Sequence, residues 1–121
     1  MINGKENDEM LTIENLKEFG ADTETGVKRC MGMTDFYLEM VAKGVADTKM
    51  DELESALGEN DLGKAFDLAH AMKGVYGNLS VTALFEPISE LTELLRTKTQ
   101  TDYSQMFGDI KAKFEQLKAL I

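Results

Sequence analysis

The chain has 121 residues, of which 43% are hydrophobic and 29% are charged. This composition is typical of one folded domain and excludes a chain too polar to collapse around a core. The formal net charge of −9 argues against nucleic acid and against an anionic membrane surface as partners, because both are bound through basic patches.

Cysteine and hydropathy usage bound the compartment. A single cysteine, Cys30, cannot form an internal disulfide, so the chain does not require an oxidising environment. No apolar run approaches the roughly 20 residues of a membrane-spanning helix, and the N-terminus lacks the apolar segment of a secretory signal. We therefore expect a cytoplasmic protein that does not bind membranes. With one histidine and one cysteine, the chain has no recognisable zinc spacing, and we expect no metal site.

Residues 1–8 are polar and without periodicity, and they predict a mobile N-terminal tail ahead of a single domain over residues 9–121. One proline, no tryptophan and abundant Leu, Met, Ala, Glu and Lys favour helices over strands in that domain. A first short helix is capped by Thr12 and ended by Gly20. Asp22 or Thr23 can cap a second short helix, and we expect both to lie across one end of a bundle.

The apolar pattern then predicts a long helix from Thr34 to Leu57, weakened by Asp47 and Thr48, so that a kink or a split near Thr48 is the alternative. Asn60 or Asp61 caps the next helix, which ends at about Leu79 and holds the only histidine of the chain.

In this histidine helix, apolar residues recur at the spacing of three and four that forms a core stripe. The stripe consists of Leu62, Ala65, Phe66, Ala69, Met72, Tyr76 and Leu79. At roughly 100° per residue, His70 lies about 120° from the centre of the stripe and points away from the core. The residues that share its side are Gly63, Asp67, Gly74 and Gly77.

Two further helices complete the pattern. The first runs from Ser80 or Thr82 to Arg96 or Thr97, and Pro87 either kinks it or follows a short turn that precedes a helix beginning near Glu86; we favour the kink. Asp102 caps the last helix, which continues to the end of the chain. Short connectors join long helices as antiparallel neighbours. We therefore predict an all-α fold, an antiparallel up-down-up-down four-helix bundle with one or two short N-terminal helices packed at one end.

The surroundings of His70 indicate a role for its ring. Each interior glycine costs a helix about 1 kcal/mol relative to alanine, so glycines around an exposed imidazole indicate that something large must approach it. Lys73, one turn along the same side, can reach an anion attached to the ring. A neutral imidazole leaves one ring nitrogen as a nucleophile, and histidine is a carrier of phosphoryl groups. The alternative is an ordinary surface histidine.

The segment His70-Ala71-Met72-Lys73-Gly74, followed by Gly77-Asn78-Leu79, resembles the signature of the histidine phosphotransfer (HPt) domain family. The helical pattern from about residue 35 to residue 96 also fits that family's bundle. The resemblance implies a protein that accepts a phosphoryl group from the aspartate of one receiver domain and passes it to another receiver in a two-component phosphorelay.

The resemblance also implies roles for individual residues. His70 would be the phosphoacceptor and Lys73 the cation that stabilises the phosphate. The surface that docks the partner would comprise Gly63, Asp67, Gly74 and Gly77. Thr92 stands where family members often have a glutamate or glutamine that hydrogen-bonds the histidine ring. Thr92 and Glu93 are therefore the candidate residues around the ring, and Glu93 or a water is expected to substitute for that glutamate or glutamine.

The implied partners are response-regulator receiver domains and a hybrid sensor histidine kinase. Mg²⁺ would belong to the receiver, so we expect no cofactor on this chain, no kinase activity of its own, and a monomer. The alternative is a bundle of the same fold that carries no phosphate and acts as an adaptor or inhibitor by docking receiver domains or kinases. The presence of both His70 and Lys73 favours the phosphotransfer protein over this adaptor.

Overall fold

The computed structural model describes residues 11–121, so the expected tail over residues 1–8 lies outside the described residues. Within residues 11–121 the structure contains α-helices and no strand. The helices are α2 (Ile13–Phe19), α3 (Thr23–Arg29), α4 (Thr34–Ala46), α5 (Lys49–Gly58), α6 (Leu62–Asn78), α7 (Thr82–Arg96) and α8 (Ser104–Lys118). The predicted all-α fold is confirmed for this part of the chain, in which no helix is long and apolar enough to cross a bilayer.

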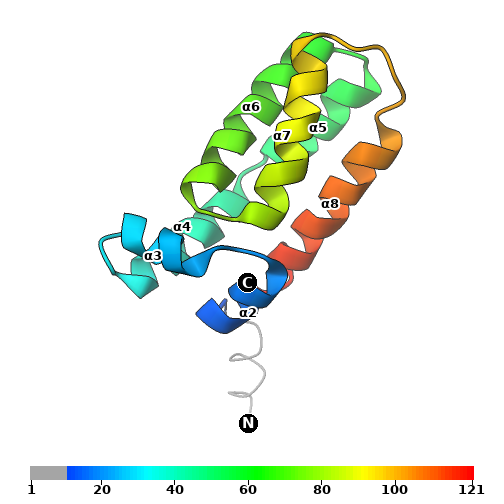
Figure 1. Ribbon diagram of the computed structural model, residues 1–121. Helices are drawn as coiled ribbons and strands as arrows, with labels where there is room; N and C mark the ends of the chain where they lie inside the picture. Colours follow the sequence, from blue (N-terminus) through cyan, green and yellow to red (C-terminus); the bar gives the residue numbers. More distant parts are fainter. Residues whose placement is uncertain (1–10) are drawn as a thin grey trace.

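The long helices lie side by side along most of the molecule, and α2 and α3 lie at one end of it (Figure 1). The most extensive packing joins α6 to α7, and further contacts join α5 to α6 and α7 to α8. Many of the side chains between these helices are aliphatic and fully buried. They include Leu53, Leu84, Ile88, Leu91, Leu95, Ile110 and Leu117.

The helix predicted from Thr34 to Leu57 is divided into α4 and α5, so the alternative of a split near Thr48 is the one observed. The break lies at Asp47, whose backbone is extended at φ −69° and ψ 150°. The Asp47 carboxylate accepts the backbone N–H of Lys49 at 2.8 Å and pairs with the Lys49 ammonium at 3.0 Å. These two bonds lower the pKa of Asp47 and hold the backbone in a form that competes with the helix.

Helix α7 continues through Pro87, which is the sixth of its residues after Val81. The alternative of a helix that begins near Glu86 is therefore wrong. A stripe of buried residues that includes Leu84 and Ile88 packs against the core on both sides of the proline, and this packing compensates for the backbone hydrogen bond that proline cannot donate.

The α2–α3 segment is fastened to the turn between α6 and α7. The N–H of Asp22 donates to the Ser80 carbonyl at 2.8 Å, and the N–H of Ala83 donates to the Gly20 carbonyl at 3.0 Å. The Arg29 guanidinium caps the end of α6 by donating to the carbonyl of Gly77 at 2.7 Å. These contacts hold the C-terminal end of α6 in place, and none of them involves the exposed residues in the middle of the helix.

A buried tyrosine of α4 completes the same attachment. The Tyr37 hydroxyl donates to the Leu79 carbonyl at 2.7 Å, and its ring lies where a Cβ on Gly26 would stand. Burial raises the pKa of Tyr37 to about 12, because the phenolate would lose its hydration. Gly26 is therefore required by the close approach of α3 to this ring.

Candidate functional site

Helix α6 forms where the sequence predicts it, because both its N-terminal cap and its apolar stripe are local features. The Asp61 carboxylate accepts the backbone N–H of Lys64 at 3.1 Å. Of the predicted stripe, Leu62, Ala65, Ala69, Met72 and Tyr76 are buried, while Phe66 and Leu79 are half-buried. His70 is exposed, as its position outside the stripe predicts.

The imidazole of His70 is held by a ring contact. Its ring stacks on that of Phe66, one turn earlier on α6, with 5.5 Å between the centroids and 17° between the planes. Among residues 11–121, neither ring nitrogen of His70 has a hydrogen-bond partner. The face of the ring is therefore occupied by Phe66, while both nitrogens stay available.

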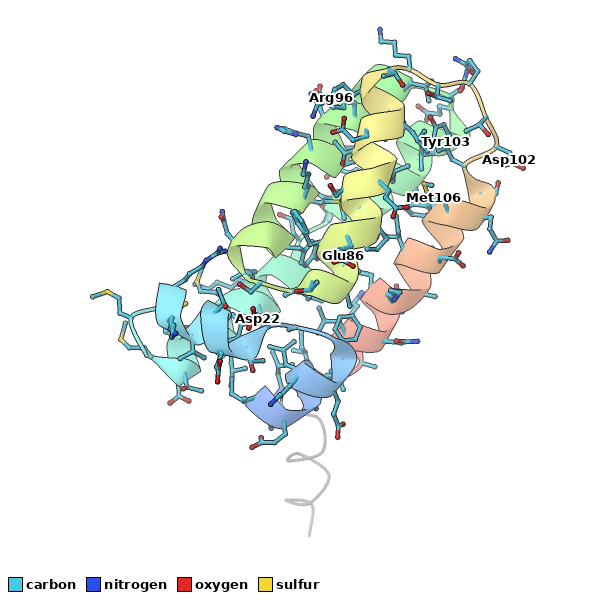
Figure 2. All side chains as sticks on the ribbon, in the orientation of Figure 1. Asp22, Glu86, Arg96, Asp102, Tyr103 and Met106 are labelled. Atoms are coloured by element: carbon cyan, nitrogen blue, oxygen red, sulfur yellow. The ribbon has the colours of Figure 1, made fainter. Side chains whose placement is uncertain are left out.

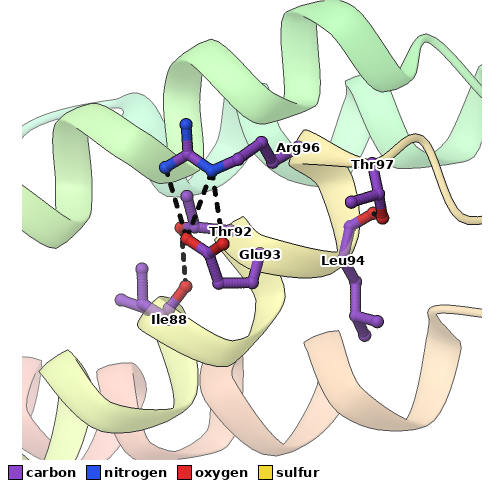
Figure 3. A network of polar contacts seen from close by, with 6 residues as sticks. All are labelled: Ile88, Thr92, Glu93, Leu94, Arg96 and Thr97. Carbon is purple, nitrogen blue, oxygen red and sulfur yellow. Dashed lines mark hydrogen bonds and ion pairs between the residues drawn. The ribbon is translucent and has the colours of Figure 1, made fainter.

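A cation from the neighbouring helix lies against the same phenyl ring. The Arg96 guanidinium, at the C-terminal end of α7 (Figure 2), is 5.0 Å from the centroid of Phe66. Glu93 accepts hydrogen bonds from Arg96 Nε at 3.3 Å and from Nη2 at 3.2 Å. Glu93, expected as a residue that orients the histidine ring, is thus hydrogen-bonded to Arg96 instead (Figure 3).

Thr92, the other candidate residue near the ring, has a partner within its own helix. It is completely buried, and its hydroxyl donates to the Ile88 carbonyl of the preceding turn at 2.7 Å (Figure 3). A threonine inside a helix satisfies its hydroxyl in this local way when its side chain is buried. The Thr92 hydroxyl is therefore bonded within α7 and makes no hydrogen bond to His70.

Lys73 lies one turn after His70 and is half-buried. The ion pairs of the described residues join Lys49 to Asp47, Arg96 to Glu93 and Lys111 to Glu54, so the ammonium of Lys73 has no carboxylate partner there. Asp67, expected on the docking surface, is exposed and likewise unpaired within residues 11–121. Lys73 therefore keeps its positive charge available beside the imidazole.

The glycines around His70 fall into two groups. A Cβ added to Gly74 would meet nothing within 4 Å, and one added to Gly63 would meet only a carboxylate oxygen of Asp61 at 3.9 Å. A Cβ added to Gly77 would lie 3.0 Å from the ring of Phe85 on α7. Gly74 and Gly63 thus expose bare backbone, whereas the space beside Gly77, which was expected to be cleared, is filled by Phe85 of α7.

Phe66 and Arg96 are the residues at this site that reasoning from the sequence missed. An aromatic residue four positions before a histidine is a helical neighbour of it, so the stack was detectable from spacing. No signal in the sequence pointed to Arg96, because its contact depends on how α7 packs on α6.

The remaining reactive side chains are not gathered here. Cys30 is a free, half-buried thiol at the end of α3. Within residues 11–121, no group of three or more His, Cys, Asp or Glu side chains is arranged to hold a metal ion.

Comparison with known proteins gives one match. The family model described as the Hpt domain matches residues 42–120, which is more than half of the 121-residue chain and includes α5 to α8 with the exposed histidine. The same comparison found no significant match to a curated protein or to a solved structure.

Proposed function

The chain belongs to the Hpt domain family, and from this premise we propose that it is a histidine phosphotransfer protein whose phosphoacceptor is His70. It accepts a phosphoryl group from the aspartate of one receiver domain and passes it to the aspartate of another. The observation that carries the proposal is the exposed imidazole with both nitrogens unbonded in the described residues, beside an unpaired Lys73 and the bare backbone of Gly74.

The chemistry requires only one nucleophilic nitrogen on this chain. Its lone pair forms the N–P bond while the P–O bond to the receiver's aspartate breaks, and the electron pair leaves on that carboxylate. The second ring nitrogen keeps its proton. Because charge builds on the equatorial oxygens in such a transfer, the ammonium of Lys73 stabilises both the transition state and the phosphohistidine.

The receiver must bring its phosphoaspartate within bonding distance of the ring, and the bare face of α6 provides the room. In our proposal Gly63, Asp67 and Gly74 form the docking surface. Helices α4 and α5 together, α6, α7 and α8 are the four antiparallel members of an up-down-up-down bundle, which displays this face on its second long helix. We further propose a cytoplasmic monomer without a cofactor, with Mg²⁺ supplied by the receiver.

The proposal is tested by incubating the chain with a panel of phosphorylated receiver domains and following transfer of the label. We expect an acid-labile, alkali-stable phosphoryl group on the wild-type chain and none on His70→Gln. Because the chain has one histidine, no second imidazole complicates the result. Tight binding of several receivers without any label would instead support the adaptor that carries no phosphate.

A further inference from the structure

The ring that is stacked on His70 has a task beyond packing. We propose that Phe66 is a positioning residue for phosphoryl transfer, and this proposal rests on the proposed function. Phe66 fixes the plane of the His70 imidazole by stacking on it, because no hydrogen bond from the described residues does so. The proposal follows from the geometry of the two rings, the partners of the nearby polar groups and the contact that holds Phe66 itself.

The two rings are close enough and parallel enough to restrain each other. A centroid separation of 5.5 Å with planes 17° apart is an offset stack, one of the arrangements that aromatic pairs prefer. Phe66 is half-buried and packs against the core, whereas His70 is exposed. The core therefore anchors the phenyl ring, and the phenyl ring restrains the imidazole.

No polar group in the described part of the chain performs this task. The hydroxyl of Thr92 is bonded to the Ile88 carbonyl, and the carboxylate of Glu93 is bonded to Arg96. An exposed imidazole without a hydrogen bond can rotate about its last side-chain torsion, because that torsion has only broad preferences. The stack is the contact that limits this rotation.

An aromatic stack restrains the imidazole without blocking its nitrogen atoms from nucleophilic attack. The lone pair of an imidazole nitrogen lies in the plane of the ring, so attack on phosphorus proceeds from the ring edge. Phe66 covers a face of the ring and leaves the edge free, whereas a hydrogen bond would occupy one of the two nitrogens. Fixing the plane therefore directs the lone pair without blocking it, which is a contribution of orientation.

A residue of helix α7 also contacts the phenyl ring of Phe66. The guanidinium of Arg96 is 5.0 Å from the Phe66 centroid and is held there by its two-point contact with Glu93. A cation over an aromatic ring is attracted by the negative charge of the ring face. Phe66 is thus held both by the core and by Arg96. The orientation of the imidazole therefore depends, through Phe66, on how α7 packs against α6.

The test compares Phe66→Leu, which removes the stack but keeps an apolar side chain, with Phe66→Tyr, which keeps the ring. Phosphoramidate is the donor, because a small molecule labels the histidine without a receiver having to dock. We expect the maximal rate of labelling to fall roughly two- to tenfold in Phe66→Leu, with little change in KM, and to stay near the wild-type value in Phe66→Tyr. Phe107→Leu, a buried phenylalanine of α8, controls for a general loss of packing.

NMR of the imidazole protons supplies a readout that a purely structural role would not move. The single histidine makes these signals unambiguous. In Phe66→Leu they should move downfield as the ring current of the phenyl group is lost, and in Phe107→Leu they should not. Unchanged shifts, or equal labelling rates in wild type and Phe66→Leu, would overturn the role of Phe66. Failure of the wild-type chain to be labelled by either phosphoramidate or receivers would overturn the proposed function instead, and the NMR arm would still report the stack.

Discussion

Two alanine substitutions on one helix separate a glycine that leaves space for a partner from a glycine that leaves space for a neighbouring helix. Gly74 and Gly77 lie three residues apart on α6, and they stand on either side of His70 when the helix is viewed along its axis. An added Cβ would meet nothing within 4 Å at Gly74, but at Gly77 it would meet three carbons of the Phe85 ring, the nearest two at 3.0 and 3.1 Å. We therefore expect Gly74→Ala to stabilise the fold and Gly77→Ala to lack that gain.

The magnitudes follow from these contacts. Replacing an interior helical glycine by alanine contributes about 1 kcal/mol, and Gly74→Ala should show all of it. At Gly77 the same gain is opposed by overpacking against Phe85, which costs typically about 1–3 kcal/mol in a packed site. Phe85 is half-buried and can shift by a few tenths of an ångström, which places the cost near the lower end. The two variants should therefore differ in free energy of unfolding by about 1–2 kcal/mol.

Urea unfolding followed by circular dichroism measures this difference directly, because both variants share the same reference chain and helix. The slope of the free energy with urea should be unchanged, so the difference should appear in the midpoint. A Gly77→Ala chain as stable as Gly74→Ala would show that Phe85 does not occupy the space beside Gly77. A Gly74→Ala chain less stable than wild type would show that the face is not bare.

Three further predictions concern charge, docking and pH. Gly74→Gln should slow labelling by a phosphorylated receiver about tenfold while labelling by phosphoramidate is unchanged, since only the receiver needs the bare face. Lys73→Gln should slow labelling by both donors roughly tenfold, with an unchanged urea midpoint, because its ammonium has no carboxylate partner in the described residues. The pKa of Tyr37 is raised from 10 to about 12 in the folded chain. The contribution of Tyr37 to the free energy of unfolding is therefore fully present below pH 10 and is lost as the pH rises from 10 to 12. Tyr37→Phe should weaken this alkaline loss in pH-dependent unfolding, although it costs about 1 kcal/mol at neutral pH through the missing bond to Leu79.

The helices and their ends could be predicted from the sequence because their signals are local. Thr12 and Asp61 accept the backbone N–H groups that their positions predict, and Gly20 ends α2 with a φ of 123°. The outcome at Asp47 was harder to predict. Its carboxylate competes with the helix for a backbone donor, and whether the helix kinks or divides depends on how the flanking segments pack.

The partners of polar side chains could not be predicted in the same way. Thr92 is completely buried, and its hydroxyl bonds the Ile88 carbonyl within α7. Arg96 lies at the end of α7, and the packing of α7 on α6 places its guanidinium over Phe66. In both cases the partner of the side chain is determined by tertiary packing. The spacing of residues within one helix carries no information about that packing.

The same limit applies to the glycines, and their surroundings indicate from which direction the proposed receiver would approach. On a helix wheel Gly77 and Gly74 lie on either side of His70, and the spacing places both on the side of the helix that His70 shares. Helix α7 covers the Gly77 side, where Phe85 fills the space and where Arg96 contacts Phe66. The bare backbone is therefore confined to the Gly74 side. Under the proposed function, we therefore expect a receiver that delivers phosphate to approach the free edge of the imidazole from the Gly74 side, opposite the ring face that is stacked on Phe66.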